Sequence, residues 1–503
     1  MKKPSPLSAV ARPALFCLLL MVPALLPAAE DPVRVPRPNI VFIVADDLGW
    51  ADTGCYGSTF YETPNIDRLA GQGMRFTDAY AASSVCSPTR ASILTGKYPA
   101  RLHLTDWLPG RPDRPDQKLN RPPFRQLLSP RESTVSKALK EAGYRTAFIG
   151  KWHLGGSPGC WPEHLGFDLN IAGSGHGHPP SYFSPYGLPN LKDGPAGEYL
   201  NDRLTEEALR FIDSAKNQPF FLYLPHYAVH LPLQAKTEVI LKYEAKAATL
   251  PKTGAETIME RDQTVRQLQN HPVYAGMVQS LDESVGRILD RLTELGLDKN
   301  TIVIFTSDNG GLSTTGGATS NLPLRGGKGW PYEGGIREPL LVKWPGVTKP
   351  GSLSSVPVTS TDFFPTLLQL AGLPLHPKEH LDGTSFLTAL KGDGLPERPL
   401  FWHYPHYSNQ GGAPNGAVRL GDYKLIEWYE DMSAELFNLR DDPGERHDLA
   451  VSMPGKVTEL RSLLHRWRKE VRAQMPSRNP HYDPAARRSR HQPPVAPVNS
   501  VDA

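Results

Sequence analysis
Two pairs of oxygen-bearing side chains follow apolar, β-branched runs that lie far apart in the sequence. Asp46 and Asp47 follow the run Asn39–Ala45, and Asp308 and Asn309 follow a second such run. Adjacent carboxylates repel each other, so their natural stabiliser is a hard divalent cation, Ca²⁺ or, less favoured, Mg²⁺. Either pair alone is typical of a turn or a helix cap. Two such pairs, each after a buried strand, predict a metal site instead, and the sequence lacks the His and Cys spacing of a zinc site.

A cysteine precedes a short helix-compatible run. Cys86 is followed by Ser-Pro-Thr and then by Arg90, and the run continues from Ala91 to Leu94. Proline suits the first turn of a helix, where its missing N–H is not needed. Cys86 and Arg90 are therefore expected near a helix N-terminus, which favours anions. An isolated motif of this kind is more often a structural cysteine, and it is the rest of the chain that favours a chemical role.

Cationic side chains also follow predicted strands or glycine turns. Lys151 and His153 follow the run Arg145–Ile149 and alternate along an extended chain, so both side chains can face one site. Glycines around Lys328 let the backbone turn tightly and bring its ammonium group to an anion. Taken singly, such a lysine usually faces solvent and such a histidine is usually packed. Their shared position after strands and turns favours a common site.

The elements that must position these side chains alternate between strands and helices. The predicted strands are residues 39–45, 145–149, 219–224, 301–306 and 339–343. The predicted helices are residues 134–142, 200–215 and 274–295, each with apolar residues along one stripe. This alternation predicts an α/β sandwich with a mainly parallel central sheet. Ligands gather beyond the carboxyl ends of the strands in such sheets, and the polar clusters named above follow strands.

The two ends of the chain differ from this pattern. From about residue 396, short strand-like runs joined by turns, followed by an amphipathic helix at 457–471, predict a small α+β C-terminal subdomain at 396–474, after a catalytic domain at 30–395. The Pro- and Arg-rich end, 475–503, is predicted to be a disordered tail. Residues 1–29 are basic, then apolar, then small, which is typical of a secretory signal peptide, so we expect a secreted or periplasmic protein. We expect no stable membrane span, since the apolar stretch is short and broken by Pro23.

The composition excludes some classes of partner. The 503 residues include 55 basic and 52 acidic side chains, a net charge of +3. So small an excess of positive charge does not indicate a nucleic-acid partner. The 50 prolines and 44 glycines indicate a loop-rich chain whose sites lie on loops. Of the four cysteines, Cys17 lies in the predicted signal peptide, and the sequence leaves open whether Cys55 and Cys160 form a disulfide.

Motifs along most of the chain, from about residue 38 into the C-terminal subdomain, resemble those of the sulfatase family and stand in the same order. They are Cys86-x-Pro-x-Arg90 with a trailing Thr-Gly, the segment 143–155, His230 before Leu-Pro, and the glycine-rich segment around Lys328. His226 lies too early for the family's single histidine and is expected to be part of the scaffold. No candidate catalytic position departs from the family pattern.

The resemblance implies an alkaline phosphatase-like α/β fold and a sulfuric ester hydrolase (sulfatase) activity. It implies that Cys86 is oxidised to formylglycine before folding, by a formylglycine-generating or an anaerobic maturation enzyme. A calcium ion would be held by the modified residue together with Asp46, Asp47, Asp308 and Asn309. The sulfate would be surrounded by Arg90, Lys151, His153, His230 and Lys328.

The chemistry implied by the resemblance is physically coherent. A sulfate ester is a dispersed anion, so its transition state needs a metal and cationic donors rather than one strong acid. The second hydroxyl of an aldehyde hydrate can expel the sulfate from the sulfated intermediate, which a plain thiol cannot do. Asp308 is expected to be the base for attack and His153 the base for release, with Lys328 or His230 as the donor to the leaving alcohol.

Two alternatives stay open at this point. The same scaffold can serve a phosphate or phosphonate ester hydrolase, and an unmodified Cys86 would leave a non-catalytic protein that binds sulfated glycans. The expected substrates are sulfated carbohydrates or aryl sulfates, and secretion favours a sulfated polysaccharide or its fragments. The segments expected to decide the substrate are 101–125, 176–186 and 409–415, with His176 and His178 as candidate sugar contacts.

Overall fold
The computed structural model describes Met1 and residues 37–251, 254–314 and 316–486. The predicted signal peptide, including Cys17, lies outside the described residues apart from Met1. From Arg37 onward the chain clusters as one compact unit. Among the described helices, none is both long enough and apolar enough to cross a bilayer.

A central sheet organises this unit. Its strands are β1 Asn39–Ala45, β2 Met74–Tyr80, β4 Arg145–Ile149, β5 Leu169–Ile171, β6 Phe220–Pro225, β9 Thr301–Ser307, β10 Arg337–Lys343, β11 Ser352–Ser354 and β12 Val358–Thr359. Within the described chain their order is β11-β2-β10-β9-β1-β6-β4-β5, with β12 also paired to β2. The pairs β9–β1, β1–β6, β6–β4 and β4–β5 are parallel, whereas β10 is antiparallel to both of its neighbours. The predicted mainly parallel sheet is confirmed, and the run at 339–343 is its antiparallel member.

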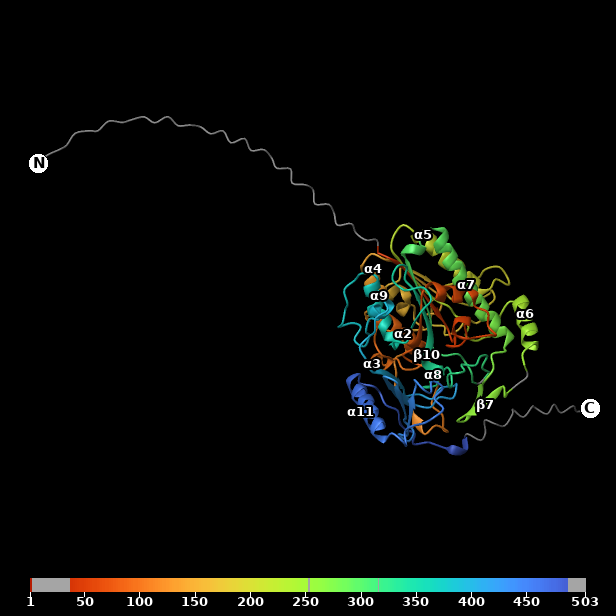
Figure 1. Ribbon diagram of the computed structural model, residues 1–503, viewed down its shortest axis with the longest axis vertical. Helices are drawn as coiled ribbons and strands as arrows, with labels where there is room; N and C mark the ends of the chain where they lie inside the picture. The colour runs from red at the N-terminus through yellow and green to blue at the C-terminus, as the bar shows by residue number, and fades with distance from the viewer. Residues whose placement is uncertain (2–36, 252–253, 315, 487–503) are drawn as a thin grey trace, which may run out of the picture. The chain divides into compact units, whose positions relative to one another are not determined.

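Both faces of the sheet are covered, which explains why its strands are continuous apolar runs. Val41 and Ile43 of β1 pack on one face against α1 Pro64–Gln72, α5 Leu200–Ala215, α6 Thr237–Ala248 and α7 Pro272–Glu294. Phe42 and Val44 pack on the other face against α2 Cys86–Thr95, α4 Val135–Glu141, α9 Phe363–Leu370 and α10 Leu387–Leu390. Figure 1 shows α5 and α7 on one side of β10 and α2, α4 and α9 on the other. The predicted sandwich is therefore confirmed.

A smaller antiparallel sheet follows the central one. In the described chain it has the order β13 Leu400–Tyr404, β14 Asn415–Leu420, β15 Tyr423–Trp428 and β16 Ala434–Asn438. Helix α11, Pro454–Glu470, packs Leu464 and Trp467 against it, close to the predicted 457–471. Short elements lie outside the two sheets: β3 Leu119–Asn120, β7 Thr257–Glu260, β8 Gln263–Arg266, β17 Ser477–Arg478, α3 Pro99–Leu102 and α8 Glu333–Ile336. The predicted α+β content after residue 396 is confirmed, while the domain boundary itself stays a prediction.

The disordered tail was predicted to begin at residue 475, which is too early. Ser477 and Arg478 form β17, which pairs with β3. Asn479 donates from its backbone N–H to the carbonyl of Lys118 at 2.9 Å. Pairing with a segment more than 350 positions earlier orders residues whose composition alone predicts disorder, and residues 487–503 lie outside the described part of the chain.

A buried charge cluster joins the smaller sheet to the loop that carries Lys328. The ammonium nitrogen of Lys424 on β15 lies 2.9 Å from a carboxylate oxygen of Glu333 and 2.9 Å from one of Glu445, and all three side chains are 0% exposed. The second Glu445 oxygen accepts the backbone N–H of Glu333 at 2.6 Å. Because a buried charge is tolerated only when paired, these contacts fix the start of α8 against the smaller sheet.

Candidate active site
The carboxyl ends of β1 and β9 bring the two predicted oxygen-bearing pairs together. Ala45 is in register with Ser307, so the residues that follow both strands start side by side. The Asp47 backbone N–H donates to an Asp308 carboxylate oxygen at 3.2 Å, and the Asn309 amide nitrogen donates to an Asp47 carboxylate oxygen at 2.7 Å. Parallel pairing of β1 and β9 thus brings together residues that lie more than 260 positions apart in the sequence.

Asp47 adopts an unusual backbone conformation. Its φ of 62° lies in the left-handed region, which costs a non-glycine residue about 1 kcal/mol or more. Strain of this kind persists where the surroundings over-determine it, and it clusters at functional sites. Here the strained backbone turns the Asp47 carboxylate toward Asn309 and Lys328.

Cys86 is the first residue of α2 and is only 2% exposed. Its sulfur and one ligand atom each of Asp46, Asp47 and His230 lie within 4.8 Å of one another. Pro88 lies in the first helical turn, where the sequence predicted it. The predicted nucleophile precursor therefore lies beside the predicted metal ligands.

Three cations lie against the three carboxylates. Lys151 donates to both Asp46 oxygens at 2.9 and 2.7 Å, and it is 0% exposed. Lys328 lies 2.7 Å from Asp47. The guanidinium of Arg90 lies 2.7 Å from an Asp308 oxygen and donates to the carbonyl of Lys151 at 2.8 Å. These cations are thus aimed at the end of β1 and β9.

Burial and the neighbouring cations shift the pKa values of the acidic groups in opposite directions. Burial raises the pKa of Asp46 to about 8 although Lys151 opposes it. Burial also acts on Asp47, but Lys328 holds the pKa of that carboxyl well below its usual range. At Cys86 burial disfavours the thiolate, yet the ammonium groups of Lys151 and Lys328 outweigh it and lower the pKa of the thiol. The site therefore favours negative charge at Asp47 and Cys86.

The two predicted histidines differ in their roles. His153 lies 2.6 Å through Nε2 from the Leu108 carbonyl, which can only accept, so Nε2 carries the proton. Its Nδ1 is buried without a hydrogen-bond partner among the described residues, and burial lowers its pKa well below the usual value. His230 lies with Nε2 3.5 Å from Asp47, and its ring stacks on His178 at a centroid distance of 5.9 Å. Neutral His153 thus has a free lone pair, while His230 faces the carboxylates.

The donor set fits a hard divalent cation. Asp46, Asp47 and Asp308 supply carboxylate oxygens, and the Asn309 amide oxygen is buried without a hydrogen-bond partner among the described residues. Oxygen ligands of this kind suit Ca²⁺ or Mg²⁺. His230 joins the cluster although the sequence pattern placed it with the sulfate-binding cations.

A cavity of about 380 Å³ opens above this cluster. Its lining includes Asp47, Cys86, His153, His230 and Lys328. The three segments expected to decide the substrate also contribute to it: Trp107, Leu108 and Pro109; Gly177 and His178; Asn409 and Gln410. His176 does not line it. The sequence reasoning did not single out Trp107, although it named the segment, because one aromatic residue in a loop carries no spacing signal.

Other predicted residues lie outside this cavity. His226 is buried and lies 3.0 Å from the Ser284 hydroxyl, as expected of a scaffold residue. Cys55 and Cys160 are free thiols, so no disulfide joins them.

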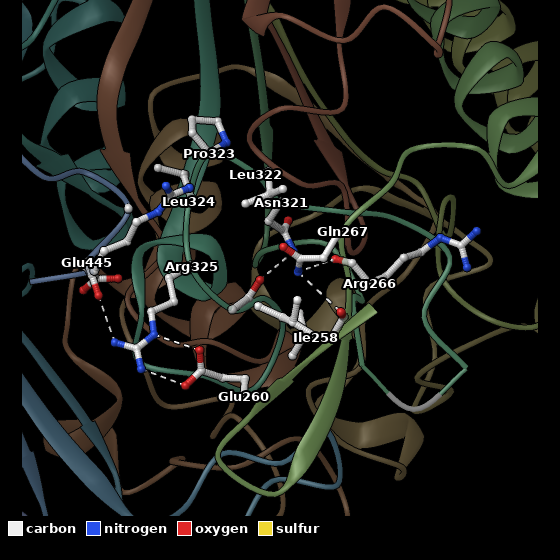
Figure 2. A pocket seen from close by; sticks show the side chains of 14 residues that line it. Ile258, Glu260, Arg266, Gln267, Asn321, Leu322, Pro323, Leu324, Arg325 and Glu445 are labelled. Carbon is white, nitrogen blue, oxygen red and sulfur yellow. Dashed lines mark hydrogen bonds and ion pairs between the residues drawn. The ribbon is translucent and has the colours of Figure 1, made fainter. Parts of the chain in front are cut away.

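A separate cavity of about 410 Å³ lies under the β7–β8 hairpin (Figure 2). Three arginines line it, and the guanidinium of one of them, Arg325, donates to the Glu260 carboxylate at 2.7 and 2.9 Å and to the Glu445 carbonyl at 2.9 Å. None of the predicted catalytic residues lines it. Arg325 thus acts as a structural tie between the hairpin and the smaller sheet.

Comparison with known proteins gives consistent matches over most of the chain. The family described as Sulfatase matches residues 38–373, and the family described as N-sulphoglucosamine sulphohydrolase, C-terminal, matches residues 327–474. A "Sulfatase" of Formosa agariphila is 33% identical over 89% of this chain and 92% of its own length. An N-acetylgalactosamine-6-sulfatase of Mus musculus is 34% identical over 89% of this chain and 83% of its own.

A solved structure of Ps i-CgsB in complex with k-i-k-neocarrahexaose is also similar. It has a TM-score of 0.70 and 33% identity, and the match covers 86% of this chain and 92% of that one.

Proposed function
The chain belongs to the sulfatase family and is therefore a sulfuric ester hydrolase, and on this premise we propose that it removes sulfate from carbohydrates, using formylglycine formed from Cys86 and a bound Ca²⁺. The observation that carries the proposal is the cluster of Cys86, Asp46, Asp47 and His230 within 4.8 Å at the base of an open cavity. An N-acetylgalactosamine-6-sulfatase and a structure with a bound neocarrahexaose among the similar proteins support a sulfated carbohydrate as the substrate class.

When present, formylglycine supplies the nucleophile and Ca²⁺ the Lewis acid. The residues of this chain supply charge and position. Lys328 lines the cavity beside Asp47, and the ammonium group of Lys151 is buried against Asp46, so two positive charges near Cys86 can offset the negative charge of a sulfate. Arg90 contacts both Asp308 and the Lys151 carbonyl, so we assign it the role of positioning Asp308 and Lys151 relative to each other.

We assign proton transfer to three side chains. Asp308, beside Asp47, is the base for attack. The lone pair on His153 Nδ1 accepts the proton that accompanies release of sulfate, because Nε2 already donates to Leu108. Lys328 or His230 donates to the departing alcohol.

Two measurements test the proposed function. Mass spectrometry of the peptide that contains Cys86 shows whether the cysteine is converted, and an unconverted, inactive protein would support the non-catalytic glycan-binding alternative. Catalytic efficiency on 4-nitrophenyl sulfate and 4-nitrophenyl phosphate separates a sulfatase from a phosphate ester hydrolase. We expect the sulfate to be preferred, and a preference for phosphate would overturn the assignment of substrate anion.

We further propose that the protein is secreted or periplasmic and is converted by a maturation enzyme of its host. The basic-apolar-small pattern of residues 1–29 supports the location. The burial of Cys86 supports conversion before folding, because an enzyme cannot reach a side chain that is 2% exposed. Cell fractionation followed by N-terminal sequencing of the mature protein tests the location.

A further inference from the structure
We propose that the protein has a second carbohydrate subsite next to the catalytic cavity, which binds an unsulfated or weakly charged sugar unit of an oligosaccharide. The proposal rests on the function proposed above and deepens it, because it makes an oligosaccharide rather than a single sugar sulfate the preferred substrate. The subsite is a cavity of about 420 Å³ whose lining includes Arg111, Gln117, Arg261, Gln263, Tyr407 and Glu430.

The second cavity is a neighbour of the catalytic one because two chain segments pass from one to the other. Pro109 lines the catalytic cavity, and Arg111, two residues later, lines the second. In the other segment Asn409 and Gln410 line the catalytic cavity, while Tyr407 and the glycines after Gln410 line the second. Each of these two segments contributes residues to both cavities. The two cavities therefore share a wall, which these segments form.

The shared wall is held rigidly. The Gln410 carbonyl accepts the Thr314 hydroxyl at 2.8 Å and the Trp330 indole N–H at 3.0 Å. The Ser408 backbone N–H donates to the Gly412 carbonyl at 2.7 Å, which closes the turn between the two cavities. A ligand that contacts both faces of this turn meets groups whose positions are already fixed, so little ordering is needed on binding.

The lining of the second cavity suits sugar hydroxyls better than a second sulfate. Two guanidinium groups, Arg111 and Arg261, are balanced by the carboxylates of Asp116, Asp262 and Glu430, so the lining carries no excess of positive charge. A sulfate bound there would lie among three carboxylates with only two guanidinium groups to offset its charge, whereas carboxylates, amides and guanidinium groups together match the alternating donors and acceptors of a neutral sugar.

Two side chains of the lining, Arg261 and Glu430, are held in place by neighbouring side chains before any ligand binds. The guanidinium of Arg261 lies 3.7 Å from the ring centre of Trp428 and 3.1 Å from Glu435. The Tyr407 hydroxyl donates to Glu430 at 2.6 Å, which orients that carboxylate. Gln263 is the first residue of β8 and directly follows the turn of the β7–β8 hairpin.

The test compares a small sulfate with a size series of sugars. The substrates are 4-nitrophenyl sulfate and sulfated mono-, di- and tetrasaccharides prepared from chondroitin 6-sulfate and from carrageenan. For the converted, calcium-loaded enzyme we expect kcat/KM to rise about tenfold or more with length, mainly through KM, as one or two added hydrogen bonds allow. A flat series would overturn the subsite, whereas absence of turnover on every sulfate, including 4-nitrophenyl sulfate, would overturn the proposed function instead.

Variants of the lining test whether this cavity causes the dependence of kcat/KM on substrate length. R261A/Q263A should lose about tenfold in kcat/KM on the tetrasaccharide and change less than about twofold on 4-nitrophenyl sulfate, because it removes contacts that a small substrate does not reach. Met259→Ala is the matched control, since Met259 is 65% exposed on the same hairpin and does not line the cavity. Equal losses of the double variant on both substrates, or equal losses in the control, would overturn the assignment of this cavity.

Discussion
The Lys328 ammonium lies 2.7 Å from the carboxylate of Asp47, a residue 281 positions earlier in the chain. Both side chains are buried, at 5% and 2% exposed, so neither is a surface ion pair screened by solvent. Burial disfavours the charged lysine, but the carboxylate of Asp47 raises the pKa of Lys328 above its ordinary value. The cation is therefore kept charged beside the cavity in which a sulfate would bind.

Replacement of Lys328 by alanine should reduce kcat/KM by about 10²–10³, a loss of about 2.7–4 kcal/mol of transition-state stabilisation, as for other preorganised donors. Lys151→Ala should act similarly, because its ammonium lies against Asp46. Steady-state kinetics on 4-nitrophenyl sulfate measures both. Lys349→Ala, an exposed lysine, is the control for general surface charge. An equal loss in that control would show that overall charge, not position, is what matters.

Cys86→Ala should abolish turnover while leaving the thermal unfolding temperature close to that of the unmodified chain, because the value of this side chain is chemical. Cys86→Ser should accept sulfate without releasing it, since a single hydroxyl has no route for elimination. Activity assays combined with intact mass after incubation with substrate check both variants. More than a trace of turnover by Cys86→Ala would end the formylglycine assignment.

Removal of the metal should abolish activity, and Ca²⁺ or Mg²⁺ should restore it. A ligand that binds only the folded state at about 100 times its Kd adds about 2.7 kcal/mol to the free energy of unfolding, so Ca²⁺ should also raise the unfolding temperature of the inactive Cys86→Ala protein. Calorimetry after chelation checks this independently of activity. Asp308→Asn should lose the rescue, and elemental analysis that finds stoichiometric zinc without calcium or magnesium would contradict the assignment.

His230→Ala should distinguish between two donors to the leaving alcohol. If His230 donates the proton, its loss should slow alkyl and sugar sulfates far more than activated aryl sulfates, whose leaving groups need little protonation. A leaving-group series for wild type and variant measures the difference, with the exposed His176→Ala as a control. Uniform losses along the series would leave Lys328 as the donor.

Lys424→Met should destabilise the fold by about 3–5 kcal/mol, because it leaves the carboxylates of Glu333 and Glu445 buried without their shared cation. Urea unfolding followed by tryptophan fluorescence measures the change. The exposed Lys469→Met on α11 is the control. A loss below about 1 kcal/mol, the range of a surface pair, would show that the cluster is not a structural tie.

Much of the site could be predicted because it follows strand ends. Asp46 and Asp308 were recognisable since each follows a run of β-branched residues, and parallel neighbours bring such positions together. Their individual partners could not be predicted. No pattern links Arg90 to Asp308, and the sequence placed Arg90 around the sulfate, whereas its guanidinium lies against that carboxylate and is 2% exposed.

The missed features depend on contacts between distant residues. Strand β2, Met74–Tyr80, was not predicted: its residues alternate between apolar and polar only over the first four positions, and it pairs with three strands from far along the chain, β10, β11 and β12. The stacking of His178 on His230 joins two loops 52 positions apart. Such contacts are decided by tertiary packing, which local periodicity does not encode.

All ten residues of α2 are buried, with Cys86 at its start. Another protein can therefore reach this thiol only while the chain is still extended. If Cys86 is converted as proposed, the number of competent molecules is therefore set once, before each chain folds. Two preparations of equal purity would then differ in specific activity according to their ratio of converted to unconverted chains, and turnover numbers would have to be given per titrated site rather than per milligram of protein.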